Sequence, residues 1–560
     1  MSHGDTTMGT SNTNLDRRQF TKLASAVGLG ASVGLAGCVD DDDDGTTYYF
    51  GLGSEMDTLD PQIDTSARGE VVFGAFSEPL FHFDPNGDVV PHLLSDYEVL
   101  DGGERYVFEV RDGVTFHNGE TWDADVLAWN LERLYSTQNP ARNVLGPEAE
   151  IEATGDMEVE IHYEDPYPIL PSYLTYNTNT NTMVSRSAFE ESGDDEWGVS
   201  VMVGSGPFVF EEWRRGEEIR FTRNDDYDWG PEFASNQGPS NFEELVIRII
   251  PEETTLVSEV TTGNVHASNY VPPARLETIE DHDDTAVNRI PGLSVLSLPF
   301  NQTRELMQDI NVREAIAHAV DREAVINTAI GGEGFPAYDH VVETVPGAWS
   351  REEARERGIT YDPDRARELL EESGWTNDQE GEVRTRDGEE LNVLYRAVDI
   401  GHYEETAIVV GPMLEDVGFD VDIEINEIGT YWDMLEEGEY DIKSAEHWAV
   451  ANPSDLLADA LHSDELTTPG GSVNYTNLEN DEVDALLDQA RFDPDPDERM
   501  AAVREIQDMY HENVWYHPLY GFTRALSYET GLSGTDEFFE HELWGDQYYL
   551  DKLVFDIETE

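Results

Sequence analysis

Residues 106–119 read YVFEVRDGVTFHNG, and this stretch shows the strand pattern of the chain most clearly. The apolar residues Tyr106, Phe108 and Val110 alternate with residues 107, 109 and 111, which is the two-residue period of a half-buried strand. Asp112-Gly113 supplies a tight turn, and the alternation resumes at residues 114 and 116. The stretch therefore predicts a β-hairpin.

Helical patterns are as clear elsewhere in the chain. Asp362 is expected to cap a helix that has Pro363 at its first position and ends at Gly374. Two other segments carry apolar residues at helical spacing, which predicts helices packed on the core: Val312, Ala315, Ile316, Ala319 and Val320, and Val483, Leu486, Leu487 and Ala490. Strands and helices together indicate a mixed α/β protein.

The composition is extremely acidic. The 560 residues include 119 Asp and Glu against 33 Lys and Arg, so the formal net charge is −86. Hydrophobic residues make up 39% of the chain, which is enough to build a core and excludes a disordered acidic tail. The length suggests two to four domains. After residue 22 no basic cluster could neutralise a row of phosphates, so nucleic acid and anionic lipid surfaces are poor partners.

This charge balance is typical of proteins adapted to molar salt. Two exposed carboxylates about 7 Å apart repel by roughly 0.6 kcal/mol in water, and a Debye length of about 3 Å at 1 M salt reduces that about tenfold. We therefore expect a halophilic, haloarchaeal-type protein that loses stability when salt is diluted.

The N-terminal residues predict export and lipid attachment. Arg17-Arg18 lies in a twin-arginine motif, residues 23–34 form a short apolar stretch, and residues 35–38 resemble a lipobox ending at Cys38. Residues 1–37 would be a signal and residues 38–45 an acidic tether, which places the protein on the extracellular face of the membrane through a lipid on Cys38. The alternative is a buried N-terminal helix with an inert cysteine. Cys38 is the only cysteine, so no intramolecular disulfide can form.

Enzymatic motifs are not evident in the sequence. It has no Gly-x-Ser-x-Gly elbow, no His-Glu-x-x-His and no phosphate loop. His117 and His511 are isolated, and with so many acids a pair of carboxylates is no specific sign of a glycosidase. We expect no catalytic residue, no bound metal and no cofactor.

Short motifs occur in a fixed order along nearly all of the chain beyond residue 38. They are Leu59-Asp60-Pro61, Glu78-Pro79-Leu80, Asp84-Pro85-Asn86-Gly87, Pro91-His92-Leu93, residues 106–111, Phe116-His117-Asn118-Gly119, Ala124-Asp125-Val126, Gly204-Ser205-Gly206-Pro207-Phe208, residues 223–227, residues 312–316 with Asp321-Arg322, residues 361–375, Glu439-Tyr440-Asp441, and residues 474–487. In this order the chain resembles family 5 extracellular solute-binding proteins, the peptide, nickel and opine receptors of ABC importers.

The resemblance implies a periplasmic-binding-protein-like (type II) α/β fold, a two-lobed clamshell with an extra inserted subdomain. Lobe I would comprise residues 46–80, 200–296 and 522–560, the inserted subdomain residues 81–199, and lobe II residues 297–521. The crossings between lobes would be residues 296–300 and 517–520, although each could be an ordinary core strand. Such lobes close on a ligand by hinge motion.

The resemblance also implies where a ligand would lie. In peptide-binding relatives a loop carries a Trp, then an acid that pairs with the ligand ammonium. Here His447-Trp448-Ala449 leads to Asn452 without that acid, unless Asp455 or Asp459 replaces it. The expected ligand-binding residues are Thr65, Ser66, Arg68, His447, Trp448, Ala449, Asn452, Asn474 and Tyr475. Trp448 could instead be core, and Arg68 could serve a surface ion pair.

The resemblance therefore predicts a substrate-binding lipoprotein that captures an oligopeptide or dipeptide and delivers it to ABC permease subunits, and it predicts no enzyme. We expect a monomer. Because the ammonium-binding acid is missing, an oligosaccharide or a blocked peptide is an alternative ligand. An extracellular hydrolase is the alternative of a different class. Nickel is disfavoured, since no cysteine remains for it and the histidines show no ligand spacing.

Overall fold

The structure is a computed structural model of residues 1–560. It describes residues 47–64, 69–84, 88–136, 145–175, 182–193, 196–234, 236–343, 345, 347–377, 379, 382–447, 452–465, 474–533 and 558–559. The predicted twin-arginine pair Arg17-Arg18 and the predicted lipidation site Cys38 lie outside these residues.

The largest sheet contains nine strands and draws on residues from both ends of the described chain. In sheet order the strands are β10 (Phe208–Arg214), β11 (Glu218–Arg223), β12 (Glu244–Ile249), β1 (Thr47–Leu52), β13 (Ala267–Ser268), β22 (Tyr516–Glu529), β14 (Thr285–Pro299) and β21 (Ala445–His447), and β15 (Gly334–Pro336) pairs with β22. β1 is parallel to β12, whereas β14 and β22 are antiparallel.

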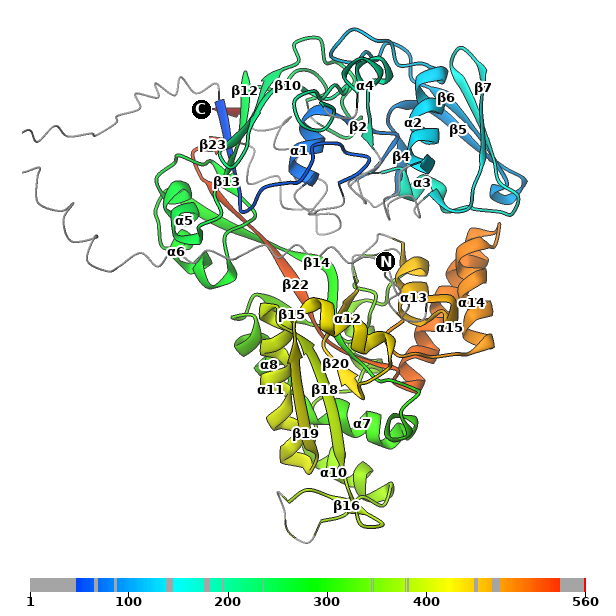
Figure 1. The fold of residues 1–560 in the computed structure, drawn as a ribbon, viewed down its shortest axis with the longest axis vertical. Helices are drawn as coiled ribbons and strands as arrows, with labels where there is room; N and C mark the ends of the chain where they lie inside the picture. Colours follow the sequence, from blue (N-terminus) through cyan, green and yellow to red (C-terminus); the bar gives the residue numbers. More distant parts are fainter. Residues whose placement is uncertain are drawn as a thin grey trace, which may run out of the picture. The chain divides into compact units, whose positions relative to one another are not determined.

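The two long strands β14 and β22 run beside each other (Figure 1). Both contribute residues to two hydrophobic cores. Near one end, Leu526 and Tyr528 of β22 belong to a core built mainly from residues 48–267. Near the other end, Leu296 of β14 and Leu519 of β22 belong to a core built mainly from residues 298–442. The register shifts between Pro291 and Val295, and such irregularities bend and twist a ladder. Both predicted crossings, residues 296–300 and 517–520, fall in this paired segment or directly after it.

The predicted hairpin at 106–116 is wrong in its second strand. β6 (Arg105–Val110) forms as expected, but its two edges pair with β5 (Leu94–Leu100) and β8 (Glu158–His162), and β7 (Glu150–Gly155) completes a four-stranded sheet. Since both edges of β6 are occupied, residues 114–116 cannot join it. Val114 and Phe116 are nevertheless buried, and Thr115 makes only an isolated bridge to Thr121. Alternation thus indicated burial correctly but not the partner strand.

The expected helices form with the expected ends and faces. Asp362 accepts a hydrogen bond from the backbone of Arg365 and caps α10 (Pro363–Glu372), and Gly374 follows its end at φ 82°. The five apolar residues of the first stripe are buried on or directly after α7 (Ile310–Ala319). On α14 (Asp481–Phe492), Val483, Leu487 and Ala490 are buried and Leu486 packs against the same core.

The remaining elements extend the two cores or form smaller hydrophobic clusters beside them. A three-stranded sheet has the order β19 (Asp420–Asn426), β18 (Asn392–Val398), β20 (Ile442–Lys443). The two-stranded ladders are β2 (Glu78–Pro79) with β9 (Thr182–Met183), β3 (Phe81–Phe83) with β4 (Val89–Pro91), β16 (Thr385–Arg386) with β17 (Glu389–Glu390), and β23 (Leu532–Ser533) with β24 (Glu558–Thr559). The other α-helices are α1 (Gly69–Phe76), α2 (Ala124–Ser136), α3 (Leu170–Tyr173), α4 (Arg186–Ser192), α5 (Glu253–Thr261), α6 (Leu276–Glu280), α8 (Arg322–Ala329), α9 (Arg351–Arg357), α11 (Gly401–Val417), α12 (Ile428–Glu436), α13 (Pro453–Leu461) and α15 (Pro496–Asn513). Within the described residues, none of the helices has both the length and the apolar character that a bilayer crossing requires.

Two buried arginines connect helices α7 and α8 by hydrogen bonds to the end of α15 and to β22. Arg313 donates to the carbonyls of Asn513, Val514 and Met307, and Arg322 donates to those of Ala337, Pro518 and Ile359. Backbone carbonyls therefore satisfy both guanidinium groups inside the fold. This explains why arginine, with five fixed donors, is found at these two motif positions.

His517 of β22 lies beside Arg322, with 3.3 Å between His517 Nδ1 and Arg322 Nη2. Burial first, then the neighbouring Arg322 and His318, lower the pKa of His517 well below its ordinary value. The unfolded chain therefore binds a proton that the folded chain does not, and His517 makes the protein less stable as pH falls below about 6.5. We expect this contribution to reach up to about 1.4 kcal/mol per pH unit.

The measurement is the free energy of unfolding by urea between pH 7.5 and 5.5 at fixed molar salt. His517→Asn should lose stability less steeply on acidification than the wild type. His282→Gln changes an exposed histidine and should keep the wild-type slope. Equal slopes for His517→Asn and wild type would contradict the prediction.

Candidate functional site

Five of the predicted ligand-binding residues lie outside the described part of the chain: Thr65, Ser66, Arg68, Trp448 and Ala449. Their roles stay predictions. The other four, His447, Asn452, Asn474 and Tyr475, lie on elements that flank residues 448–451 and 466–473.

His447 and Tyr475 are packed together. His447 is the last residue of β21, pairs with Val295 of β14, and is 3% exposed. Its ring lies 5.1 Å from the ring of Tyr475 and 4.4 Å from that of His340. The structure therefore brings two of the predicted residues into one aromatic cluster beside the long strands.

Asn474 holds a turn. It is fully buried, and its side-chain amide donates to the carbonyls of His462 and Leu478 at 3.0 and 3.1 Å. The Asn474 carboxamide oxygen accepts from the Thr476 hydroxyl at 2.7 Å. These bonds fix the backbone that presents Tyr475.

Lys443 is a residue in this region that the sequence reasoning did not select. It is 2% exposed, and its Nζ atom lies 3.3 Å from the ring centre of Tyr475 and 4.9 Å from that of Tyr431. Burial lowers the pKa of Lys443 well below its ordinary value. The available signal was composition, because Lys443 is one of only three lysines in a chain whose other thirty bases are arginines.

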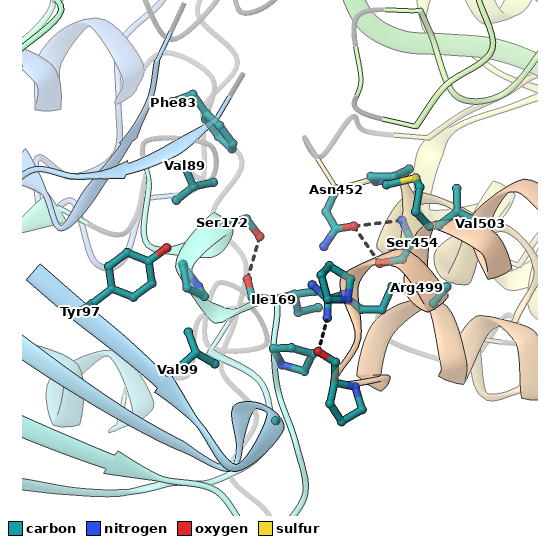
Figure 2. A pocket seen from close by; sticks show the side chains of 18 residues that line it. Phe83, Val89, Tyr97, Val99, Ile169, Ser172, Asn452, Ser454, Arg499 and Val503 are labelled. Carbon is teal, nitrogen blue, oxygen red and sulfur yellow. Dashed lines mark hydrogen bonds between the residues drawn. The ribbon is translucent and has the colours of Figure 1, made fainter. Parts of the chain in front are cut away.

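Asn452 caps helix α13. Its side-chain oxygen accepts from the Ser454 backbone at 3.0 Å and from the Ser454 hydroxyl at 2.7 Å, and Pro453 occupies the first helical position. Figure 2 shows Asn452 and Ser454 on one wall of a cavity.

The cavity has a volume of about 550 Å³ and two walls from distant parts of the sequence. Most of the lining is apolar, with a few polar side chains, as is usual for small-molecule sites. One wall contains Phe83, Val89, Tyr97, Val99, Gly102, Pro168, Ile169, Pro171 and Ser172, and the other contains Asn452, Pro453, Ser454, Ala490, Pro494, Pro496, Arg499, Met500 and Val503.

A buried polar triad, Tyr173, Asp455 and Arg491, joins α3, next to the first wall, to α13 and α14, next to the second. Tyr173 donates its hydroxyl to Asp455 Oδ2, and Arg491 Nε donates to Asp455 Oδ1 at 2.9 Å. Tyr173 and Asp455 are 6% and 5% exposed. Burial raises the pKa of Asp455, while Arg491 and Tyr173 lower it. Both oxygens of Asp455 are engaged within the protein.

The comparisons with known proteins now identify the family. The family model "Bacterial extracellular solute-binding proteins, family 5 Middle" matches residues 88–465. The chain belongs to this family. As a member of family 5, it is a solute-binding protein rather than an enzyme, and it is an extracellular protein by family.

Relatives of this family 5 protein match over most of their length. The oligopeptide-binding protein AppA of Bacillus subtilis is 24% identical over 79% of this chain and 80% of its own. Among solved structures, NikA from Brucella suis in complex with Fe(III)-EDTA matches with a TM-score of 0.77 at 23% identity, covering 92% of this chain and 100% of its own. AppA from Bacillus subtilis in complex with a nonapeptide matches with a TM-score of 0.66 at 21% identity, covering 90% and 98%.

These likenesses confirm the predicted fold class. The solved neighbours are periplasmic binding proteins of the type II, two-lobed class, and the mixed α/β elements of this family 5 chain follow the same fold. The lobe boundaries and the ligand-binding residues stay predictions.

Proposed function

We propose that this family 5 protein is the substrate-binding receptor of an ABC importer and that it captures a short peptide, either an oligopeptide or a dipeptide, for delivery to the permease. The family match over residues 88–465 carries this proposal. The relatives add support, since one is named an oligopeptide-binding protein and its structure holds a nonapeptide.

The arrangement of the cores fits capture by closure. We assign lobe I to residues 46–80, 200–296 and 522–560, the inserted subdomain to 81–199, and lobe II to 297–521. On this assignment β14 and β22 carry both crossings, and the cavity of Figure 2 lies between the inserted subdomain and lobe II. A ligand held there would be enclosed by hinge motion of these parts.

Export and attachment form part of the same proposal. Arg17-Arg18 would direct folded export, and a lipid on Cys38 would hold a monomeric receptor at the outer face of the membrane near its permease. Residues 38–45 would separate the folded part from the lipid.

The loop after Trp448 lacks the acid that pairs with the ligand ammonium in peptide-binding relatives, and this affects which ligand we expect. Asp455 already binds Tyr173 through one oxygen and Arg491 through the other, so a peptide amine would have to share an oxygen that is already engaged. An uncompensated ammonium is costly to desolvate. We therefore expect Trp448 to supply a stacking surface and main-chain groups to bind an extended peptide, with an oligosaccharide as the alternative ligand.

The experiment is a thermal-shift screen in molar salt with peptides of two to nine residues and with oligosaccharides, followed by mass spectrometry of the recovered ligand. A peptide at about 100 times its Kd should stabilise the protein by about 2.7 kcal/mol and be recovered intact. Trp448→Ala should weaken binding at least about tenfold through loss of stacking and buried area, whereas Trp213→Ala, on β10, should not. A rise in melting temperature with oligosaccharides alone would show that the ligand is a sugar and not a peptide. Cleavage of the bound molecule would show that the protein is a hydrolase.

A further inference from the structure

We propose that Glu78, His82 and His92, none of which lines the cavity of Figure 2, form a site for one first-row transition-metal ion such as Zn²⁺. One ligand atom from each side chain lies within 4.8 Å of the other two. Glu78 Oε2 is 2.8 Å from His92 Nε2 and 4.0 Å from His82 Nε2.

The spacing of these atoms suits a tetrahedral ion. Metal–ligand bonds of about 2.0–2.2 Å at tetrahedral angles place ligand atoms roughly 3.4 Å apart. The two distances from Glu78 Oε2, 2.8 and 4.0 Å, each lie about 0.6 Å from that value, and all three ligand atoms lie within 4.8 Å of one another. The 4.0 Å separation is too long for a hydrogen bond between Glu78 and His82. The two imidazole rings lie 4.5 Å apart at 72°, and both direct a nitrogen toward the same carboxylate oxygen.

The cluster is buried and supplies three protein ligands, so a water molecule or another group would complete a tetrahedral site. Two imidazole nitrogens and a carboxylate oxygen suit Zn²⁺ and its neighbours in the first transition row. Glu78, His82 and His92 are 2%, 4% and 2% exposed, so solvent does not compete for the ion. Glu78 is on β2, His82 is on β3, and His92 follows β4, so the ion would join two short ladders that have few backbone hydrogen bonds of their own.

Groups outside the ligand set hold the ligands in place. Tyr227 donates its hydroxyl to Glu78 Oε1 at 2.6 Å, which leaves Oε2 toward the histidines. The His92 backbone nitrogen donates to the Leu80 carbonyl at 2.8 Å, and Arg111 donates to the His92 carbonyl at 3.3 Å. Of these contacts, the Tyr227 hydrogen bond is the one made to a ligand side chain, and such bonds orient metal ligands and raise affinity.

The ion would also supply a cross-link that this chain cannot obtain otherwise. With Cys38 as its only cysteine, the chain can form no internal disulfide. A metal ion bound by residues of β2, of β3 and directly after β4 would restrict the unfolded chain as a disulfide does, and would so stabilise the core built mainly from residues 48–267. Binding of the ion is then coupled to folding.

The test is metal binding by the full-length protein after treatment with a chelator, in molar salt that suppresses weak association with surface acids. Titration with Zn²⁺ should show one saturable equivalent and a higher melting temperature, and Co²⁺ should give the absorption of a tetrahedral site. His92→Gln and His82→Phe should each abolish the saturable equivalent, Tyr227→Phe should weaken it about 10–100-fold, and the exposed-site control His282→Gln should leave it unchanged.

His82→Phe keeps an aromatic ring in the packing, so it tests the ligand role even where His92→Gln does not fold. The absence of a saturable equivalent in the wild type would overturn the proposal, as would binding that survives in His82→Phe. Peptide binding is measured separately, so failure of this site leaves the receptor function untouched.

Discussion

Asp455→Ala is expected to lower the free energy of unfolding by about 3 kcal/mol. The substitution leaves the Tyr173 hydroxyl and the Arg491 guanidinium without the carboxylate that both now contact. Removing one member of a buried charge pair costs about 3–5 kcal/mol, and we expect the lower end because 27% of the Arg491 side chain remains exposed. The measurement is urea unfolding at fixed molar salt.

The matched control lies on the same helix as Arg491. Glu482→Gln removes an exposed carboxylate from α14 and should change stability by less than about 0.5 kcal/mol. If Asp455→Ala were as stable as Glu482→Gln, the triad would contribute nothing measurable.

Tyr173→Phe tests whether the triad contributes to closure of the lobes, apart from its contribution to the stability of the fold. It keeps the Asp455–Arg491 pair and removes only the bond from α3. On the proposed lobe assignment that bond exists only when the inserted subdomain meets lobe II, so its loss lowers the closed population and should weaken ligand binding roughly tenfold. Tyr361→Phe, at a tyrosine that is 51% exposed, should bind ligand like the wild type, and equal affinities for the two variants would exclude a role in closure.

The sequence was sufficient for the fold class because the evidence was local and repeated. Helix α10 is specified by three residues close in sequence, Asp362, Pro363 and Gly374, and it ends where they predict. The order of short motifs then selected family 5, which the family match confirms. Neither inference needed to know which segments meet in space.

Pairings between distant residues could not be predicted in the same way. Period-two alternation marks the buried face of β6 but carries no information on which strand pairs with it, so the hairpin partner was wrong. Asp455 was considered as an acid that could bind the ligand ammonium, because the sequence gives no sign that its carboxylate contacts Tyr173. The two residues are 282 positions apart.

The buried histidines show the same limit. His82 and His92 are ten residues apart, a spacing that matches no helical metal motif. Only the pairing of β3 with β4, where His82 lies opposite Val90, places both beside Glu78. A search of a hairpin for histidines on one face but two residues out of register would have found them, since His92 lies two residues beyond Val90.

Dilution from about 3 M to 0.1 M salt is expected to lower the melting temperature by at least about 10 °C. Even if each of the 33 bases paired with one acid, 86 carboxylates would remain in excess. Neighbouring carboxylates about 7 Å apart gain roughly 0.2–0.3 kcal/mol of repulsion per pair between these salt concentrations. A change of about 10 °C corresponds to roughly 2.5–5 kcal/mol for domains of 150–250 residues, which about ten to twenty such pairs among the 86 excess carboxylates would supply.

The local form of this prediction uses the acidic run after helix α6. Asp281, Asp283 and Asp284 are all exposed, and replacing the three with Asn should reduce the loss of melting temperature on dilution. Sucrose at matched osmolality provides the control, because it is excluded from the protein surface but screens no charge. Recovery of the lost stability by sucrose alone, or an unchanged salt response in the triple variant, would show that carboxylate repulsion is not what the salt relieves.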